Sequence, residues 1–131
     1  MSTWVRVLVY ALAPGDDPDG VTRAYHLVSE ELAGTDGLLG NELLRSVHDP
    51  HRFAVLSEWE SLAAFNAWER GTAHRPATAP LRPFQDHTRG SSFDVYAVQA
   101  SYRAGDAADA DPGQAAGRSV PPATLTIDGG M

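Results

Sequence analysis

The chain has 131 residues, the size of one domain, and its 17 acidic and 10 basic residues give a net charge of −7. This balance argues against a nucleic-acid-binding protein, because such proteins need a basic surface to neutralise phosphates. The chain has no cysteine, and all ten basic residues are arginine. Disulfides, thiolate nucleophiles, cysteine zinc sites and Schiff-base lysines are therefore excluded. With no bilayer-length apolar run and no signal peptide, we expect a cytoplasmic protein that does not contact a membrane.

The first half of the chain reads as a strand, a helix and two further strands. β-branched and aromatic residues at 4–10 predict the first strand. Apolar residues at helical spacing over 21–32 predict an amphipathic helix with an acidic entrance. Residues 38–47 and 53–59 predict two more strands. Between them, residues 48–51 carry Asp and Pro in the positions that a type I turn favours.

The second half of the chain predicts one more helix and one more strand. Ser61 is a suitable N-cap for a helix that ends near Gly71. Residues 75–90 are rich in Pro and Arg, with one short helix expected at 78–86, and residues 92–102 predict the last strand.

The last segment, 104–131, differs in composition from the rest. Ala, Gly, Pro and Asp make up 19 of its 28 residues, and it has no aromatic residue. Such a segment buries too little apolar surface to offset its ordering entropy. We therefore expect a folded domain over 1–103 and a disordered, low-complexity tail over 104–131, with weak strand character only at 124–127.

The predicted order β-α-β-β-α-β is that of the ferredoxin-like α+β fold, with an antiparallel sheet and both helices on one face. The third strand carries Phe53, Val55 and Trp59 on one side and Ala54 and Leu56 on the other. Both faces of the sheet are therefore apolar, and the face without helices needs a partner. We expect a homodimer that packs two sheets together.

Several motifs then appear in order on this topology. They are Gly37-Leu38-Leu39-Gly40, Leu44-Arg45-Ser46, Asp49-Pro50-His51-Arg52-Phe53, Ser57-Glu58-Trp59-Glu60-Ser61 and Ala64-Phe65-Asn66-Ala67-Trp68. Together they resemble the antibiotic biosynthesis monooxygenase (ABM) family, whose members are small dimeric α+β barrels. The resemblance covers roughly residues 3–100, and its most specific part is the strand-ending Trp-Glu-Ser followed by the helical Ala-Phe-x-Ala-Trp.

The resemblance to anthrone-oxidising members implies a reaction in which the deprotonated substrate itself reduces oxygen. Those members use an Asn four residues before the strand-ending Trp, that Trp, a helical Tyr and a downstream Arg. In this chain the Trp is Trp59, the Asn position is Val55 and the Tyr position is Phe65, while Arg82 can be the Arg. Two polar groups of that pattern are therefore replaced by apolar ones.

The resemblance to haem-degrading members is weaker. Those members use an Asn on the first strand, the Trp of the second helix and a His ten residues later. Trp68 matches the Trp, but Thr78 stands ten residues later, His74 is six residues away, and residues 4–10 contain no Asn.

Each candidate residue also has a purely structural interpretation. Trp59 and Trp68 either line a ligand cavity or only pack in the core. His74 either acts as a general base or is only a cation favoured by the dipole at a helix end. Arg75, Arg82 and Arg89 are solvated loop charges, or belong to a flap over an acidic substrate.

Two further sites are weaker candidates. Tyr10 can donate a hydrogen bond into a cavity, but its direction is open. His48 and His51 lie in a turn without a third strong ligand, so no metal site is expected.

The leading hypothesis is a small oxygenase of secondary metabolism that acts on an aromatic polyketide-like (polyphenolic) substrate. Trp59, Arg82 and His74 are the catalytic candidates, and Trp68, Phe65, Val55 and Tyr10 are the substrate-binding candidates. We expect no bound metal or flavin, oxygen as co-substrate, and reduced flavin at most from outside. The alternatives are a polyketide cyclase or rearrangement enzyme on the same fold and a non-catalytic ligand-binding dimer.

Overall fold

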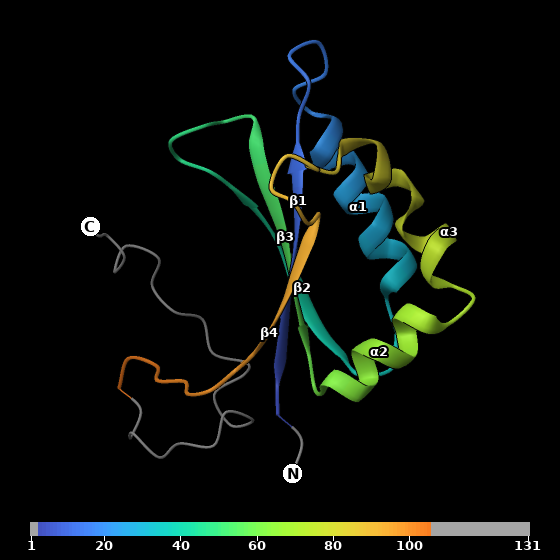
Figure 1. Ribbon diagram of the computed structural model, residues 1–131, viewed down its shortest axis with the longest axis vertical. Coiled ribbons are helices and arrows are strands. Elements are labelled where there is room, and N and C mark those ends of the chain that lie inside the picture. Colours follow the sequence, from blue (N-terminus) through green and yellow to red (C-terminus); the bar gives the residue numbers. More distant parts are fainter. Residues whose placement is uncertain (1–2, 106–131) are drawn as a thin grey trace. The chain divides into compact units, whose positions relative to one another are not determined.

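The computed structural model describes residues 3–105 (Figure 1). The chain divides after Val98, and the strands and helices found in residues 3–105 all lie before that point. They are β1 Val5–Leu12, α1 Gly20–Leu32, β2 Leu38–Arg45, β3 Arg52–Trp59, α2 Leu62–Arg70, α3 His74–Thr78, the 3-10 helix η1 Ala79–Phe84, and β4 Phe93–Ala97. The predicted ferredoxin-like order is confirmed, with α3 and η1 added before the last strand. The predicted tail lies outside the described residues from residue 106 on, including 124–127.

The sheet is antiparallel throughout, and its strands lie in the order β2-β3-β1-β4. Val5 at the start of β1 pairs with Trp59 on one side and Ala97 on the other. This register corrects the predicted length of the last strand, which ends at Ala97 and not at residue 102. After Ala97 the pairing ends with one hydrogen bond from Val98 N to Trp4 O at 2.8 Å, just before β1 begins.

One irregularity in β2 decides which side chains face the helices. Leu38 pairs with Trp59 and Gly40 pairs with Glu58, so Leu39 is an extra residue in β2, a β-bulge. From Gly40 onward the pairing is regular, and Asn41 stands opposite Ser57. Since paired residues share a face, Asn41 lies on the same side of the sheet as Trp59.

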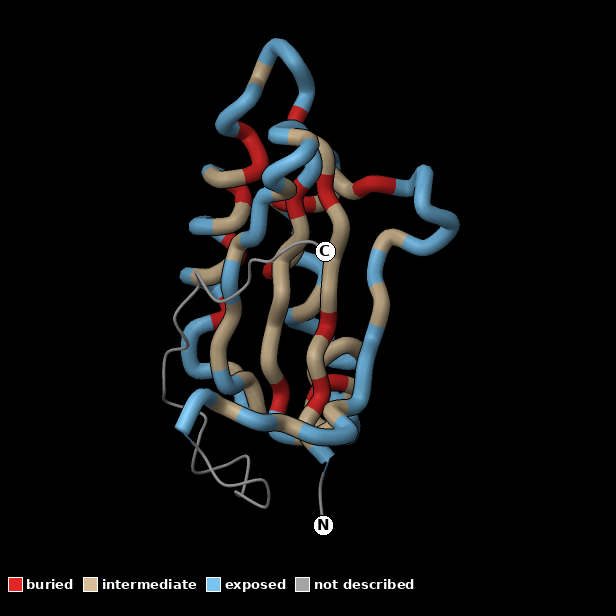
Figure 2. The backbone as a smooth tube through the Cα atoms, turned by 90° about the vertical axis from the view of Figure 1, so that its left-hand side faces the viewer, coloured by how far each residue is buried: buried red, intermediate tan, exposed pale blue. Residues whose placement is uncertain are grey.

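The helices α1, α2, α3 and η1 cover one face of the sheet (Figure 1). On this face Val5, Val7 and Ala11 of β1 are buried with Phe53 and Trp59 of β3. Figure 2 shows that the buried positions lie mainly along the strands and helices, whereas most of the turns are exposed. The open face carries the other side chains of the two central strands. These are Arg6, Leu8, Tyr10, Leu12, Arg52, Ala54, Leu56 and Glu58.

The two long helices are held where the sequence predicts them. Val28 and Leu32 of α1 are buried against the sheet side, while Tyr25 is only half-buried at the edge of the apolar stripe. The predicted N-cap of α2 is confirmed, because Ser61 Oγ accepts a hydrogen bond from Ala64 N at 3.0 Å. Gly71 ends this helix, also as predicted.

The segment after α2 differs from the predicted helix at 78–86. It forms α3 at His74–Thr78 and the 3-10 helix η1 at Ala79–Phe84. Pro80 and Pro83 lack the N–H groups that would continue an α-helix, so the chain tightens into 3-10 geometry. This turn of chain places His74 and Arg82 beside the helix-covered face of the sheet.

Candidate functional site

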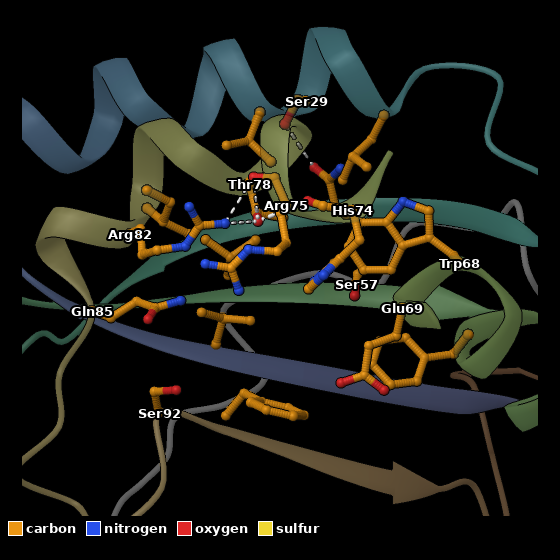
Figure 3. Close-up of a pocket in the computed structure, with 18 of the residues that line it drawn as sticks. Ser29, Ser57, Trp68, Glu69, His74, Arg75, Thr78, Arg82, Gln85 and Ser92 are labelled. Carbon is orange, nitrogen blue, oxygen red and sulfur yellow. Dashed lines mark hydrogen bonds between the residues drawn. The ribbon is translucent and has the colours of Figure 1, made fainter. Parts of the chain in front are cut away.

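A cavity of about 330 Å³ lies between the sheet and the helices, lined from every helix and from all four strands (Figure 3). Its walls are mostly apolar, with a small number of polar groups, which is the usual composition of a small-molecule site. Six of the seven predicted site residues line it. They are Val55, Trp59, Phe65, Trp68, His74 and Arg82.

Three aromatic rings form one end of this cavity. The Trp59 ring lies 5.4 Å from Phe65 and 5.3 Å from Trp68, measured between ring centres. Trp59 itself is fully buried, and its Nε1 donates a hydrogen bond to Ser57 Oγ at 2.9 Å. Trp59 therefore both packs in the core and holds a polar group of the cavity.

His74 stands at the start of α3 with its ring edge-on to Trp68, at 4.4 Å between ring centres. Burial lowers the pKa of His74 below its ordinary value of 6.5. The carboxylate of Glu69 opposes this pKa shift, and the guanidinium groups of Arg82 and Arg75 add to it. The imidazole is therefore neutral at pH 7 and can accept a proton.

Arg82 brings a fixed positive charge to the cavity. Its Nη2 donates to the backbone oxygen of Arg75 at 2.7 Å and to Thr78 Oγ1 at 2.9 Å (Figure 3). Within residues 3–105, Arg82 has no carboxylate partner within ion-pair distance. The guanidinium is thus available to an anionic ligand.

The cavity also contains polar residues that the sequence did not single out. Asn41 of β2, Ser57 of β3 and Ser29 of α1 all line it, and the Tyr25 hydroxyl donates to Asn41 Oδ1 at 2.6 Å. Ser57 shares the period-two face of Val55 and Trp59, a signal that would have found it. Asn41 has no such signal, because the bulge at Leu39 changes the alternation in β2.

Tyr10 lies away from this cavity, contrary to the expectation that it lines the site. It belongs to the open face of the sheet, where its hydroxyl donates to Asp94 at 2.9 Å and the Arg89 guanidinium lies 4.1 Å from its ring centre. Burial and the Asp94 carboxylate raise the pKa of Tyr10. Its neighbour Val9 takes the place in the cavity, since side chains alternate along a strand.

Two general features complete the description. Among residues 3–105, no three His, Asp or Glu side chains are grouped closely enough to hold a metal ion. Within the same range, no helix has the length and apolar character needed to cross a membrane.

Known proteins resemble this chain at the level of fold and sequence. It is 32% identical over 90 residues to protein SchA of Streptomyces halstedii, and this match covers 69% of this chain and 24% of SchA. It is 33% identical over 69 residues to a mycobilin-producing haem oxygenase of Mycobacterium tuberculosis, covering 53% of this chain and 65% of that protein. The chain thus spans about a quarter of the length of SchA.

Among solved structures, SnoaB from Streptomyces nogalater superposes with a TM-score of 0.64 at 15% identity. The superposition covers 76% of this chain and 97% of SnoaB, which is described as a cofactor-independent oxygenase. A family model for antibiotic biosynthesis monooxygenases matches residues 5–79, which is more than half of the chain. The chain therefore belongs to the antibiotic biosynthesis monooxygenase family.

Proposed function

We propose that this protein is a small oxygenase of secondary metabolism that oxidises a polycyclic phenol of the aromatic polyketide type. The observation that carries the proposal is the set of aromatic rings of Trp59, Phe65 and Trp68 beside a desolvated, neutral His74. Aromatic walls favour flat aromatic ligands. A neutral imidazole in such a wall is a base matched to an acidic phenol or methylene group.

The proposed reaction converts a methylene group of the substrate into a carbonyl group. His74 takes one proton from the substrate, and the resulting anion gives one electron to O₂. The carbon radical and superoxide then combine into a peroxide anion, which takes the proton back from His74. Loss of water leaves the carbonyl group, so one CH₂ and one O₂ give one C=O and one H₂O. The substrate supplies the electrons, so the proposed reaction calls for no bound metal or flavin.

The remaining predicted residues have binding roles in this proposal. Arg82 offsets the negative charge of the substrate anion, because its guanidinium is fixed by Arg75 and Thr78 and forms no ion pair with any carboxylate of the described residues. Val55, Phe65 and Trp68 exclude water from the reacting carbon. Trp59 is a positioning residue, because its Nε1 hydrogen bond orients the Ser57 hydroxyl.

The test is oxygen uptake by purified protein with dihydroxyanthrone, after treatment with a chelator and with or without reduced flavin. We expect one O₂ consumed per quinone formed in the absence of flavin. Uptake that requires reduced flavin would retain an oxygenase but contradict the proposed electron source. No uptake under either condition would contradict the oxygenase.

A cyclase or rearrangement enzyme is the second candidate, favoured by the apolar side chains at Val55 and Phe65. In that case a polyketide substrate is converted without oxygen uptake. A non-catalytic binding protein would bind the same ligands without converting them. Product analysis under nitrogen separates the three functions.

We also propose that the protein acts as a homodimer in the cytoplasm, with the open face as the interface. Leu8 and Leu56 pair at the centre of this face, and Leu44 and Tyr96 on the flanking strands are 41% and 53% exposed. An exposed apolar sheet face of this kind is stabilised by a second copy of itself around a two-fold axis.

A further inference from the structure

The amide of Asn41 has a defined orientation in the cavity. Its oxygen accepts hydrogen bonds from the Tyr25 hydroxyl at 2.6 Å and from Ser29 Oγ at 3.4 Å, both on α1. The amide nitrogen carries the two donor hydrogens, and no described residue accepts a hydrogen bond from it. With its oxygen held by α1, Asn41 offers N–H donors to the cavity that it lines.

The hydroxyl of Ser57 is oriented by a similar arrangement. Ser57 Oγ accepts the indole N–H of Trp59 at 2.9 Å, so its own hydrogen is left to donate elsewhere. Trp59 is fully buried and packs against Phe65 and Trp68, and this packing positions its indole N–H. Ser57 also lines the cavity, and Figure 3 shows its hydroxyl oxygen on the sheet below the helices.

The two donors are neighbours. Asn41 and Ser57 stand directly opposite each other in the β2–β3 pairing, and directly opposed residues have Cβ atoms about 4.5–5.5 Å apart. An oxygen atom placed between them receives one hydrogen bond from each. Both donors are neutral, and each is oriented by an internal partner before a ligand arrives. Preorganised donors in an apolar cavity are the arrangement that stabilises a developing negative charge best.

We propose that Asn41 and Ser57 form an oxyanion-binding pair that holds the phenolate oxygen of the substrate. This inference rests on the proposed function, because it takes the substrate to be a phenol. His74 takes the proton from the methylene group, and the negative charge spreads to the conjugated oxygen of the substrate, which becomes a phenolate oxygen. This oxygen is held by the Asn41 amide and the Ser57 hydroxyl. Arg82 offsets the overall charge of the same anion from the α3 side of the cavity, where its guanidinium is bound to Thr78 and Arg75.

The experiment measures the pKa of a bound phenol by its absorbance, with dihydroxyanthraquinone as a probe that is not oxidised further. Wild-type protein is expected to lower the pKa of the bound probe relative to the free probe. Asn41→Asp keeps the shape of the side chain and both bonds from α1, but it offers a carboxylate to the cavity. We expect it to raise the bound probe's pKa by at least about one unit, a tenfold change in its ionisation constant.

Matched controls separate this pair from general effects of charge and volume. Gln85→Glu makes the same amide-to-carboxylate change in the same cavity, and we expect a smaller pKa shift from it. Ser57→Ala should also raise the pKa of the probe, whereas Ser92→Ala, which removes another cavity hydroxyl, should not. Ser57→Ala leaves the Trp59 N–H without an acceptor, so thermal melting must accompany it. If Ser57→Ala does not fold, the comparison of Asn41→Asp with Gln85→Glu decides the matter.

The outcomes distinguish this inference from the proposed function. A lowered probe pKa in the wild type that is lost in Asn41→Asp supports the pair even if dihydroxyanthrone causes no oxygen uptake. Equal probe pKa values in the wild type and Asn41→Asp overturn the pair even if oxygen uptake is observed. A wild-type protein that does not bind the probe, or that binds only its neutral form, also overturns it.

Discussion

The cavity lowers the pKa of His74, and a lowered pKa keeps the imidazole neutral, as a proton acceptor must be. Its pKa lies below 6.5 chiefly because of burial, so it is a neutral acceptor above that pKa and a protonated, inactive group below it. We therefore expect kcat/KM for dihydroxyanthrone to fall as the pH drops through a value below 6.5. His74→Gln should remove this acid limb and lower kcat/KM about a hundredfold or more.

Variants of the charged residues around His74 test whether the acid limb belongs to His74, because they should shift its pKa in opposite directions. Glu69 raises the pKa of His74, so Glu69→Gln should move the acid limb to lower pH. Arg75 lowers the same pKa, so Arg75→Gln should move the limb to higher pH. If the pH of the acid limb is the same in both variants and in the wild type, the limb reports the ionisation of another group.

Trp59 gives a second prediction at this scale. Trp59→Phe keeps an aromatic ring in the core but removes the N–H that holds Ser57. We expect a loss of about 1–3 kcal/mol in the free energy of unfolding, measured with denaturant. We expect a fall in kcat of about tenfold or more, because the Ser57 hydroxyl is no longer oriented. If the unfolded fraction alone accounts for the lost activity, Trp59 serves only packing.

At the scale of elements, the contact between α2 and the turn before β2 depends on Gly37. This residue has a φ of 84°, and a Cβ there would collide with the Cβ of Ala64. Gly37→Ala should therefore lower the free energy of unfolding by about 2–4 kcal/mol, from backbone strain and overpacking together. Gly34→Ala is the matched control, because Gly34 has a φ of 83° with open space around it and should cost only about 1–2 kcal/mol. Equal losses in chemical denaturation would contradict the contact with Ala64.

The elements also show what the sequence determines. The order of strands and helices, the turn at 48–51 and the cap at Ser61 follow from local chemistry, and the structure confirms them. The end of β4 at Ala97 depends on where β1 begins, which no local pattern contains. The alternation in β1 does not show which of its two sets of side chains faces the helices. The side of the sheet on which Tyr10 lies could therefore not be predicted. Asn41 could not be assigned to the cavity, because an apolar run gives no sign of an extra residue at Leu39.

At the scale of the whole molecule, the open face predicts the oligomeric state. Leu56→Asp places a charge at the centre of this face and should convert a dimer into a monomer in sedimentation equilibrium. Val47→Asp is the control, because Val47 is 90% exposed in the turn between β2 and β3 and should leave the dimer intact. A wild-type protein that is monomeric at all concentrations would contradict the proposed interface.

The bulge at Leu39 has a consequence for how such a cavity tolerates a change in chain length. Deleting this one residue would leave Leu38 opposite Trp59, Gly40 opposite Glu58 and Asn41 opposite Ser57, now in regular alternation, so Asn41 would stay in the cavity. A straight strand that kept Leu39 would instead place Asn41 opposite Leu56, on the open face. The bulge therefore absorbs one extra residue without moving the polar lining of the cavity. Relatives that are one residue shorter at this position are expected to keep the side chain equivalent to Asn41 in their own cavities.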